Sequence, residues 1–246
     1  MGRRPSFLLS DNQRMEIVSF GETCLRLRGR EGIVATDAYP RIVGPTGRGL
    51  TADIVTYSHE DGQQSLGLRQ PTDSSGAAKR KTARTEGQRL PTSLEPAFLL
   101  DSPGEFEVHH VLITGVQTYR DEHDGAERGT NVCFVYELDG VHVAHLGDVG
   151  HLLTQAQVAE FGGIDVLCVP IGGSLGAARA AELVAQLDAN LIVPMPLDGA
   201  DAAGGELERF LHEMSVAKGE PVAKLSVTSS SIPAETTVVL LDPRGR

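Results

Sequence analysis

The sequence predicts an α+β fold in which two β-sheets pack face to face and helices lie outside them. Short β-branched segments separated by glycine dominate the chain up to residue 148, and helical periodicity alternates with buried strands after residue 150. Two β-rich runs that each end in helices are typical of two sheets sharing one core. A chain of 246 residues is long enough to bury that core as one domain.

The first half consists of predicted strands around one polar stretch. Segment 97–119 predicts two or three strands with a turn at Pro103-Gly104, and segment 131–148 predicts a hairpin whose Asp139-Gly140 pair favours a type I′ turn. The earlier strands are expected at 15–20, 24–29, 32–37 and 52–58.

Residues 1–14 are predicted to be a disordered tail, followed by a single domain over 15–242 with a disordered insertion at about 67–95. The insertion is polar and lacks a hydrophobic period. Its basic residues indicate either a solvated loop, which composition favours, or an arm that binds nucleic acid; they are Lys79, Arg80, Lys81, Arg84 and Arg89.

The second half alternates helices with apolar strands. Thr154 is expected to cap a short helix, and amphipathic helices are expected over 175–189 and 204–217. Buried strands are expected at 164–173 and 190–196, and the last strands at 223–241. The Gly172-Gly173 pair before a helix predicts a turn, with an anion site at the helix N-terminus as the weaker alternative.

Composition narrows the classes of function. The net charge of −11 argues against a general nucleic-acid binder and against attraction to anionic membranes. No apolar run reaches the ~18 residues of a membrane helix. The three cysteines, Cys24, Cys133 and Cys168, lie apart in apolar runs, which predicts buried reduced thiols and a cytoplasmic protein.

Four local sequences, taken in order, resemble the metallo-β-lactamase fold. They are "ADIVTYSHE" (52–60), the long run from "SPGEFEVHH" to "HLGDVGH" (102–151), "DVLCVPIGG" (165–173) and "LIVPMP" (191–196). The resemblance runs from Met15 to Leu241, and the most similar branch is the ascorbate-6-phosphate lactonase-like branch of Zn-dependent hydrolases. The resemblance implies a four-layer αβ/βα sandwich, and branch members are often oligomeric.

The resemblance also implies where metal ligands belong. Members of the family usually carry His-x-His-x-Asp-His after the strand that ends in "ADIV", a histidine after "TGV.TY", the aspartate of "HLGD" and a histidine in "PMH". Such ligands hold zinc, whose bound hydroxide is the nucleophile. Here only His59 and Asp148 keep a ligand of the expected kind. The other positions hold Asp61, Gln63, Gln64, Arg120 and Pro196, and Glu22 stands where relatives often have histidine.

These replacements predict a degenerate metal site with no confident catalytic residue. Arg120 is a permanent cation at a ligand position, so we expect it to pair with Asp148, and with Asp61, in the space of the metal. His145 and His151 are candidates to support Asp148. Alternatively, His59, Asp61 and Asp148 form a residual site for one Zn²⁺, Mn²⁺ or Mg²⁺ ion, with His145, His123 or water.

The sequence therefore predicts a metallo-β-lactamase-fold protein without a cofactor that binds a small molecule or a protein partner. The first alternative is an active hydrolase with one metal, acting on a phosphorylated sugar, lactone or ester. The remote alternative is a nucleic-acid-associated protein that uses the basic loop. A serine hydrolase is disfavoured because Ser58 has no evident base and acid partners in the sequence.

Overall fold

The computed structural model describes residues 14–60, 90–197 and 205–243. The predicted tail lies outside these residues except for Arg14, and the predicted insertion lies outside them up to residue 89. Residues 92–94, which were expected to belong to the insertion, instead form a 3-10 turn in which Leu94 is fully buried. The burial of one apolar side chain is therefore what sets the C-terminal limit of the polar stretch.

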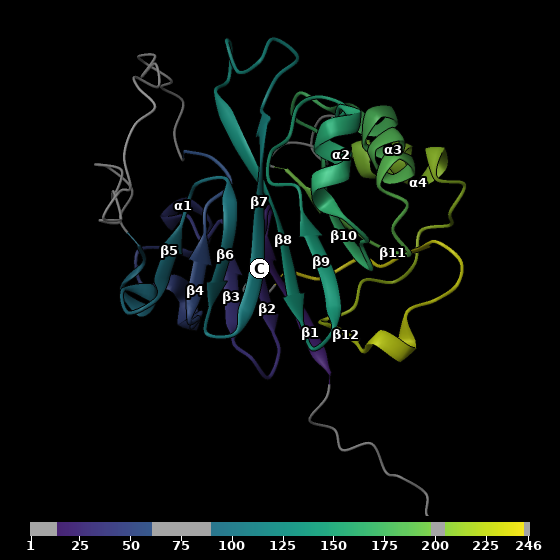
Figure 1. Cartoon of the computed structure of the whole chain (residues 1–246). Helices are drawn as coiled ribbons and strands as arrows, with labels where there is room; N and C mark the ends of the chain where they lie inside the picture. The colour runs from purple at the N-terminus through teal and green to yellow at the C-terminus, as the bar shows by residue number, and fades with distance from the viewer. Residues whose placement is uncertain (1–13, 61–89, 198–204, 244–246) are drawn as a thin grey trace, which may run out of the picture.

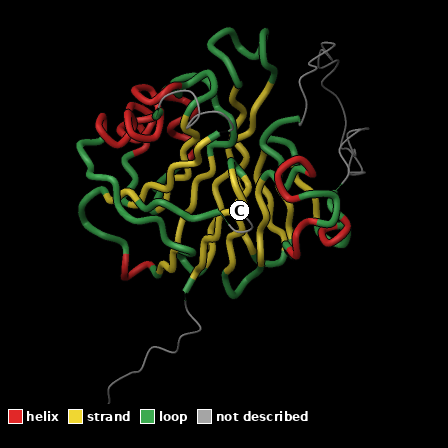
Figure 2. Tube along the Cα trace, turned by 180° about the vertical axis from the view of Figure 1, so that it is seen from behind, coloured by secondary structure: helices red, strands yellow, loops and turns green. Residues whose placement is uncertain are grey.

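Two β-sheets face one another at the centre of the described part of the chain (Figures 1 and 2). The six-stranded sheet has the order β12-β1-β2-β3-β4-β5, and the seven-stranded sheet has the order β13-β11-β10-β9-β8-β7-β6. The strands of the first sheet are β1 (Met15–Gly21), β2 (Cys24–Arg28), β3 (Ile33–Thr36), β4 (Ile54–Thr56), β5 (Phe98–Leu100) and β12 (Leu225–Val227). Those of the second are β6 (Gly104–Val108), β7 (Val111–Tyr119), β8 (Thr130–Leu138), β9 (Val141–His145), β10 (Val166–Ile171), β11 (Leu191–Pro196) and β13 (Thr237–Val238).

Helices cover the outer faces unequally. Three of them, α2 (Gln155–Phe161), α3 (Gly176–Leu187) and α4 (Glu206–Glu213), gather on the side of β10 and β11, and the short α1 (Pro40–Val43) lies on the opposite side of the molecule (Figure 1). Thr154 begins α2 with a capping box, as the sequence predicts. The layers confirm the predicted sandwich of two sheets with helices outside.

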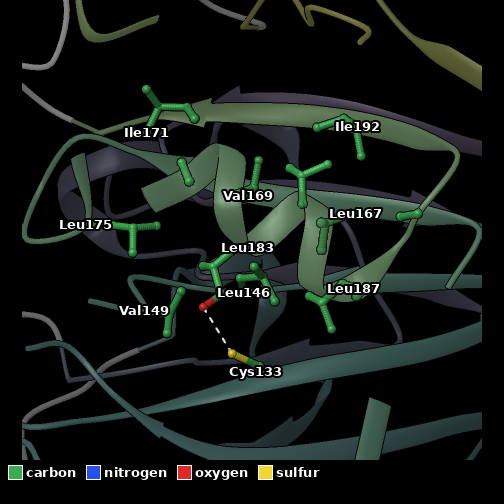
Figure 3. Close-up of a cluster of buried hydrophobic side chains, with 14 of the residues drawn as sticks. Cys133, Leu146, Val149, Leu167, Val169, Ile171, Leu175, Leu183, Leu187 and Ile192 are labelled. Carbon is green, nitrogen blue, oxygen red and sulfur yellow. Dashed lines mark hydrogen bonds between the residues drawn. The ribbon is translucent and has the colours of Figure 1, made fainter. Parts of the chain in front are cut away.

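The core is divided among three apolar clusters that follow these layers. One lies between the sheets and includes Ile17, Phe134 and Val166. A second lies between the seven-stranded sheet and its helices, where Leu183 and Leu187 of α3 pack near Leu167 and Val169 of β10 (Figure 3). The third, around Tyr39 and Tyr57, lies beneath α1. Aliphatic side chains fill most of this volume, as the scarcity of aromatic residues requires.

The three cysteines are free and buried, as predicted. Burial raises the pKa of Cys133 and of Cys168 to about 12, so both are protonated and unreactive at neutral pH. The Cys133 thiol donates to the carbonyl of Leu146 at 3.4 Å, drawn in Figure 3, and thereby joins β8 to the loop after β9.

Polar contacts join the two sheets across the apolar core. Thr56 Oγ1 and the Tyr136 hydroxyl lie 2.6 Å apart and connect β4 with β8. The fully buried His145, at the end of β9, donates from Nε2 to the carbonyl of Thr23 at 2.8 Å. Burial lowers the pKa of His145, although Asp37 and the Thr23 carbonyl act in the opposite direction. The ring is therefore neutral in the folded protein at pH 7.

Acidification should destabilise the fold through His145. The pKa of His145 in the folded protein is below its unfolded value of about 6.5. As the pH falls below about 6.5, the unfolded chain therefore binds a proton at His145 that the folded protein does not. The free energy of unfolding consequently decreases as the pH falls. We expect the melting temperature to fall between pH 7 and pH 5, and to fall less steeply in His145→Gln, whose amide can still donate to Thr23. An equal slope in both proteins would contradict this assignment.

Candidate functional site

The candidate site lies where several strands end at one edge of the sandwich. β9, β10 and β11 are parallel, and β7 runs in the same direction because it is antiparallel to β8, which is antiparallel to β9. Their C-terminal ends therefore present Arg120, Asp148, Gly173 and Leu197 together. The loop after β4 contributes His59, so the topology assembles residues that are up to 138 positions apart, from 59 to 197, in the sequence.

His59 is held by a chain of hydrogen bonds that begins at Asp37. The fully buried Asp37 carboxylate accepts from the Ser58 amide and from the Ser58 hydroxyl, both at 2.7 Å. Because the Ser58 hydroxyl donates its single proton to Asp37, its oxygen can only accept from His59. The Nδ1–H of His59 therefore donates to Ser58 Oγ at 2.8 Å. The Tyr39 hydroxyl also donates to the carbonyl of His59 at 2.6 Å. This tautomer leaves His59 Nε2 with its lone pair available.

Ser58 thus has an acid and a histidine as hydrogen-bond partners, which its sequence context does not reveal. The directions of these two hydrogen bonds are wrong for a nucleophile. Its hydroxyl donates to the acid and accepts from the histidine, the reverse of a serine activated by a base. Ser58 is also buried against Gly147, where an added Cβ would lie 2.5 Å from Ser58 Oγ. The expectation against a serine hydrolase therefore holds for a different physical reason.

Arg120 and Asp148 form the ion pair that the sequence predicts. Arg120 Nε and Nη2 donate to Asp148 Oδ2 at 2.8 and 2.6 Å, and the two side chains are only 17% and 7% exposed. The third nitrogen, Nη1, donates to the carbonyl of Arg128 at 3.2 Å. Every nitrogen of the Arg120 guanidinium is therefore engaged, which fixes this side chain as part of the structure.

A second arginine, Arg128, reaches the same carboxylate and was not singled out from the sequence. Its Nη2 donates to Asp148 Oδ2 at 3.2 Å and its Nη1 donates to the Ser174 hydroxyl. Arg128 lies in the 121–129 loop, between the ligand positions Arg120 and Asp148 but at neither of them, so the family's ligand pattern does not mark it. Two guanidinium groups consequently share the Asp148 carboxylate, so these three side chains together carry a charge of +1.

Asp121 shapes the loop that presents Arg128. Its buried carboxylate accepts the backbone N–H groups of His123, Gly125, Glu127 and Arg128 at 2.6 to 3.1 Å. Burial raises the pKa of Asp121, but the four N–H donors together outweigh it and lower the pKa overall. The carboxylate therefore stays ionised and holds the loop in one conformation.

Asp148 itself is fixed by its loop. The side-chain oxygen of Asn131 accepts the Asp148 N–H at 3.0 Å, and the Asn131 amide donates to the Leu146 carbonyl at 3.0 Å. Gly147 adopts φ +63°, and a Cβ there would lie 2.4 Å from Ser58 Cβ. The glycine of "HLGD" is thus required because the loops of His59 and Asp148 touch at this point.

The residues at the C-terminal ends of β10 and β11 border the site opposite His59. Gly173, at φ +64°, lies so close to its neighbours that a Cβ would be 2.9 Å from Leu197 Cδ1, 3.2 Å from Asp148 Oδ1 and 3.5 Å from Arg128 Nη1. Pro196, the last residue of β11, supplies no donor or acceptor side chain at the position where the family carries histidine.

The candidate supporting histidines act at a distance from Asp148. His151 accepts the Tyr119 N–H through Nε2 at 3.1 Å and lies 2.7 Å from the Leu152 carbonyl through Nδ1, so it fixes the backbone just before Arg120. His145 binds the Thr23 carbonyl, as described above. His123 is exposed and pairs with Glu127, and Glu22 pairs with Arg41. The described contacts of these four side chains do not include Asp148.

The described residues at this position are a poor set of ligands for a divalent metal. In the described part of the chain, no three His, Cys, Asp or Glu side chains converge in the geometry of a metal site. Asp148 Oδ2 already accepts three guanidinium N–H groups, and a cation beside Arg120 would be repelled by several kcal/mol even at an effective dielectric of about 20. Asp61, Gln63 and Gln64 lie outside the described residues.

A comparison with protein families identifies this architecture. The family model described as the beta-lactamase superfamily domain matches residues 16–196. The chain belongs to this superfamily. The match includes β1 to β11 and every residue of the Arg120–Asp148 cluster, and the two-sheet arrangement agrees with the metallo-β-lactamase fold expected from the sequence.

Relatives within the superfamily are named as hydrolases. The chain is 27% identical over 219 residues to a UPF0173 metal-dependent hydrolase of Methanoculleus marisnigri, covering 86% of this chain and 94% of that protein. It is 30% identical to a Thermotoga maritima structure whose name describes a Zn-dependent hydrolase of the metallo-beta-lactamase superfamily, with a TM-score of 0.65 and coverage of 92% and 98%. A metal-dependent hydrolase structure from Parabacteroides distasonis, 16% identical with a TM-score of 0.54, shares the fold.

No helix in the described residues is long and apolar enough to cross a membrane.

Replacing Asp121 should loosen the loop that carries Arg128. In Asp121→Asn, an amide N–H₂ faces backbone donors, so at least one buried N–H loses its acceptor at a cost of about 1–3 kcal/mol. We expect the melting temperature to fall by several degrees, measured by differential scanning calorimetry. Asp124→Asn is the matched control, because Asp124 is exposed in the same loop and its φ of +53° suits asparagine. Equal melting temperatures for the two variants would contradict the role of Asp121.

Proposed function

We propose that this superfamily member binds a small-molecule ligand, without a metal cofactor, at the position of its relatives' catalytic centre. The observation that carries the proposal is the placement of Arg120, whose three guanidinium nitrogens are all engaged and two of which donate to Asp148. A guanidinium so fixed takes both the charge and the space that a bridging metal needs. The fold is retained, and the chemistry that depends on a metal-bound hydroxide is not.

Several replacements are mutually consistent with this function. Arg120 and Arg128 both pair with the Asp148 carboxylate, so its burial costs far less than that of a lone carboxylate. Pro196 removes a donor where a ligand histidine stands in relatives. Among the described residues, the hydrogen bonds of Ser58 run opposite to those of a serine nucleophile.

One observation favours a second candidate, a hydrolase with a single metal ion. His59 donates from Nδ1 to Ser58, which leaves Nε2 as the lone-pair nitrogen, and histidines that ligate metals have this arrangement. Burial lowers the pKa of His59, and the nearby Arg120 lowers it too. Asp37 acts in the opposite direction but does not outweigh them. The ring is therefore neutral and able to ligate. On this reading His59, Asp61 and Asp148 would hold the ion after Arg120 turns away.

The metal content of the purified protein separates the two candidates. The protein is purified without chelator, then incubated with Zn²⁺ or Mn²⁺, and the retained metal is measured by mass spectrometry. We expect less than about 0.1 ion per chain in each case, as an estimate from the loss of most ligand positions. About one tightly held ion per chain would overturn the proposal and support the one-metal hydrolase.

Removing the guanidinium of Arg120 should destabilise the protein. Arg120→Ala deletes two of the three N–H groups that donate to Asp148 Oδ2, and a buried charge-assisted hydrogen bond contributes about 1.5–3 kcal/mol. We expect a fall of several degrees in melting temperature. Arg209→Ala, which breaks the exposed pair with Glu206, serves as the control and should change it little. An unchanged or higher melting temperature in Arg120→Ala would refute the structural role of the ion pair.

Rebuilding the family's ligand set should restore metal binding. The variant combines Asp61→His, Gln63→Asp, Gln64→His, Arg120→His and Pro196→His, which replaces the repelling cation and supplies the missing donors. We expect it to retain one or two zinc ions per chain by the same mass-spectrometric measurement. A variant that folds yet stays free of metal would show that the ligand positions have been misassigned.

A further inference from the structure

We propose that the Arg120–Asp148–Arg128 cluster is a binding site for an oxyanion, and that Arg128 is the residue that contacts it. The inference deepens the proposed function, on which it rests, by giving the chemical class of the ligand. A ligand in this site would carry a phosphate or a carboxylate group. The proposal follows from the charge balance of the cluster and from the different states of its two arginines.

The cluster has an excess positive charge. Arg120 and Arg128 together face one carboxylate, that of Asp148. Two further acids lie near these groups, but the described contacts of neither include a guanidinium. Asp37 lies behind Ser58 and accepts two hydrogen bonds from that residue, and Asp121 accepts four backbone N–H groups of the 121–129 loop. Arg179, on the nearby α3 helix, is paired with Glu122, so this pair adds no net charge. A partly buried net charge of +1 attracts a counter-ion more strongly than a charge in open water does.

The two arginines differ in how much of their donor capacity is used. Arg120 is 17% exposed and every one of its nitrogens is bonded. Arg128 is 36% exposed, and its described bonds are a long one of 3.2 Å to Asp148 and one to the Ser174 hydroxyl. A guanidinium has five N–H groups in a planar fork that matches the oxygens of a carboxylate or phosphate. Arg128 therefore keeps the geometry and the access that an anion needs.

Further hydrogen-bond donors lie next to Arg128, on Gly173 and Ser174. Ser174 is exposed and its hydroxyl lies against Arg128, so it can turn to an anion. Gly173 brings its backbone close to Arg128 Nη1, and within the described part of the chain its N–H and that of Ser174 donate to no acceptor. The α3 N-terminus itself is not the site, because the Glu206 carboxylate accepts the Ala177 N–H there.

The hollow between α3 and α4 has the opposite charge. It measures about 800 Å³, and its charged lining residues are three acids, Glu206, Glu208 and Glu213, and two arginines, Arg179 and Arg209. Arg209 is already paired with Glu206. The excess of acids in that hollow would repel an anion, unlike the Arg128 cluster.

The test uses inorganic phosphate and acetate as probes, titrated into the full chain at low ionic strength by isothermal titration calorimetry. We expect at least one of the two anions to bind, and the anion that binds more tightly gives the type of oxyanion. Arg128→Gln should weaken that binding about tenfold or more, whereas Arg128→Lys should retain part of it through charge alone. Arg209→Gln is the matched control, because this exposed arginine lies outside the cluster and should bind like the unmodified chain.

Melting temperatures of all variants show that they are folded, and Arg128→Gln should change little because Arg120 still pairs with Asp148. Equal binding by Arg128→Gln and the unmodified chain, or no binding of either anion, would overturn the anion site and leave the proposed function intact. Zinc or manganese in the same samples would instead overturn the proposed function, since a resident metal would itself bind the anion.

Discussion

The paired burial of Arg120 and Asp148 is the constraint on which the site depends. A buried carboxylate at the edge of the sandwich requires a positive partner, which in a metal-dependent hydrolase would be the metal ion. Here the partner is a side chain of the same polypeptide, held by two hydrogen bonds to one oxygen. Because the guanidinium also binds the Arg128 carbonyl, the same residue that neutralises Asp148 positions the 121–129 loop.

Strand ends and buried hydrogen bonds around the pair hold Arg120 and Asp148 in place. Parallel strand ends bring the loops after β7, β9, β10 and β11 to one edge. Asn131 and the tight turn at Gly147 fix Asp148, and Asp121 fixes the loop that carries Arg128. On the other side, Asp37 and Ser58 orient the ring of His59. Buried hydrogen bonds thus fix the side chains on both sides of the Arg120–Asp148 pair.

Much of the fold could be predicted from the sequence because its signals are local. Alternating apolar strands, the Asp139-Gly140 turn and the Thr154 cap each specify their own segment, and the structure confirms all of them. The pair of Arg120 and Asp148 was also predictable, since both residues occupy positions marked by the family's ligand pattern. Expectations for Asp61, Gln63, Gln64 and the basic insertion concern residues outside the described part.

The parts that could not be predicted depend on contacts between distant segments. Arg128 lies in a polar loop at no ligand position of the family. Its placement depends on the four N–H groups that Asp121 accepts and on the bond from Arg120 to the Arg128 carbonyl. Asp37 is 21 positions from Ser58 and reaches it only through the fold, so no local pattern predicts that Asp37 orients His59 through Ser58. The 3-10 turn at 92–94 was missed for a similar reason, because its stability comes from burying Leu94 in a distant core.

The most direct measurement is a crystal structure of the protein grown with excess Zn²⁺, with diffraction recorded on both sides of the zinc absorption edge. The account predicts that the Arg120 guanidinium remains on Asp148 and that no anomalous peak lies between His59 and Asp148. A zinc peak at that position, with Arg120 turned away from Asp148, would contradict the central claim that the guanidinium has replaced the metal.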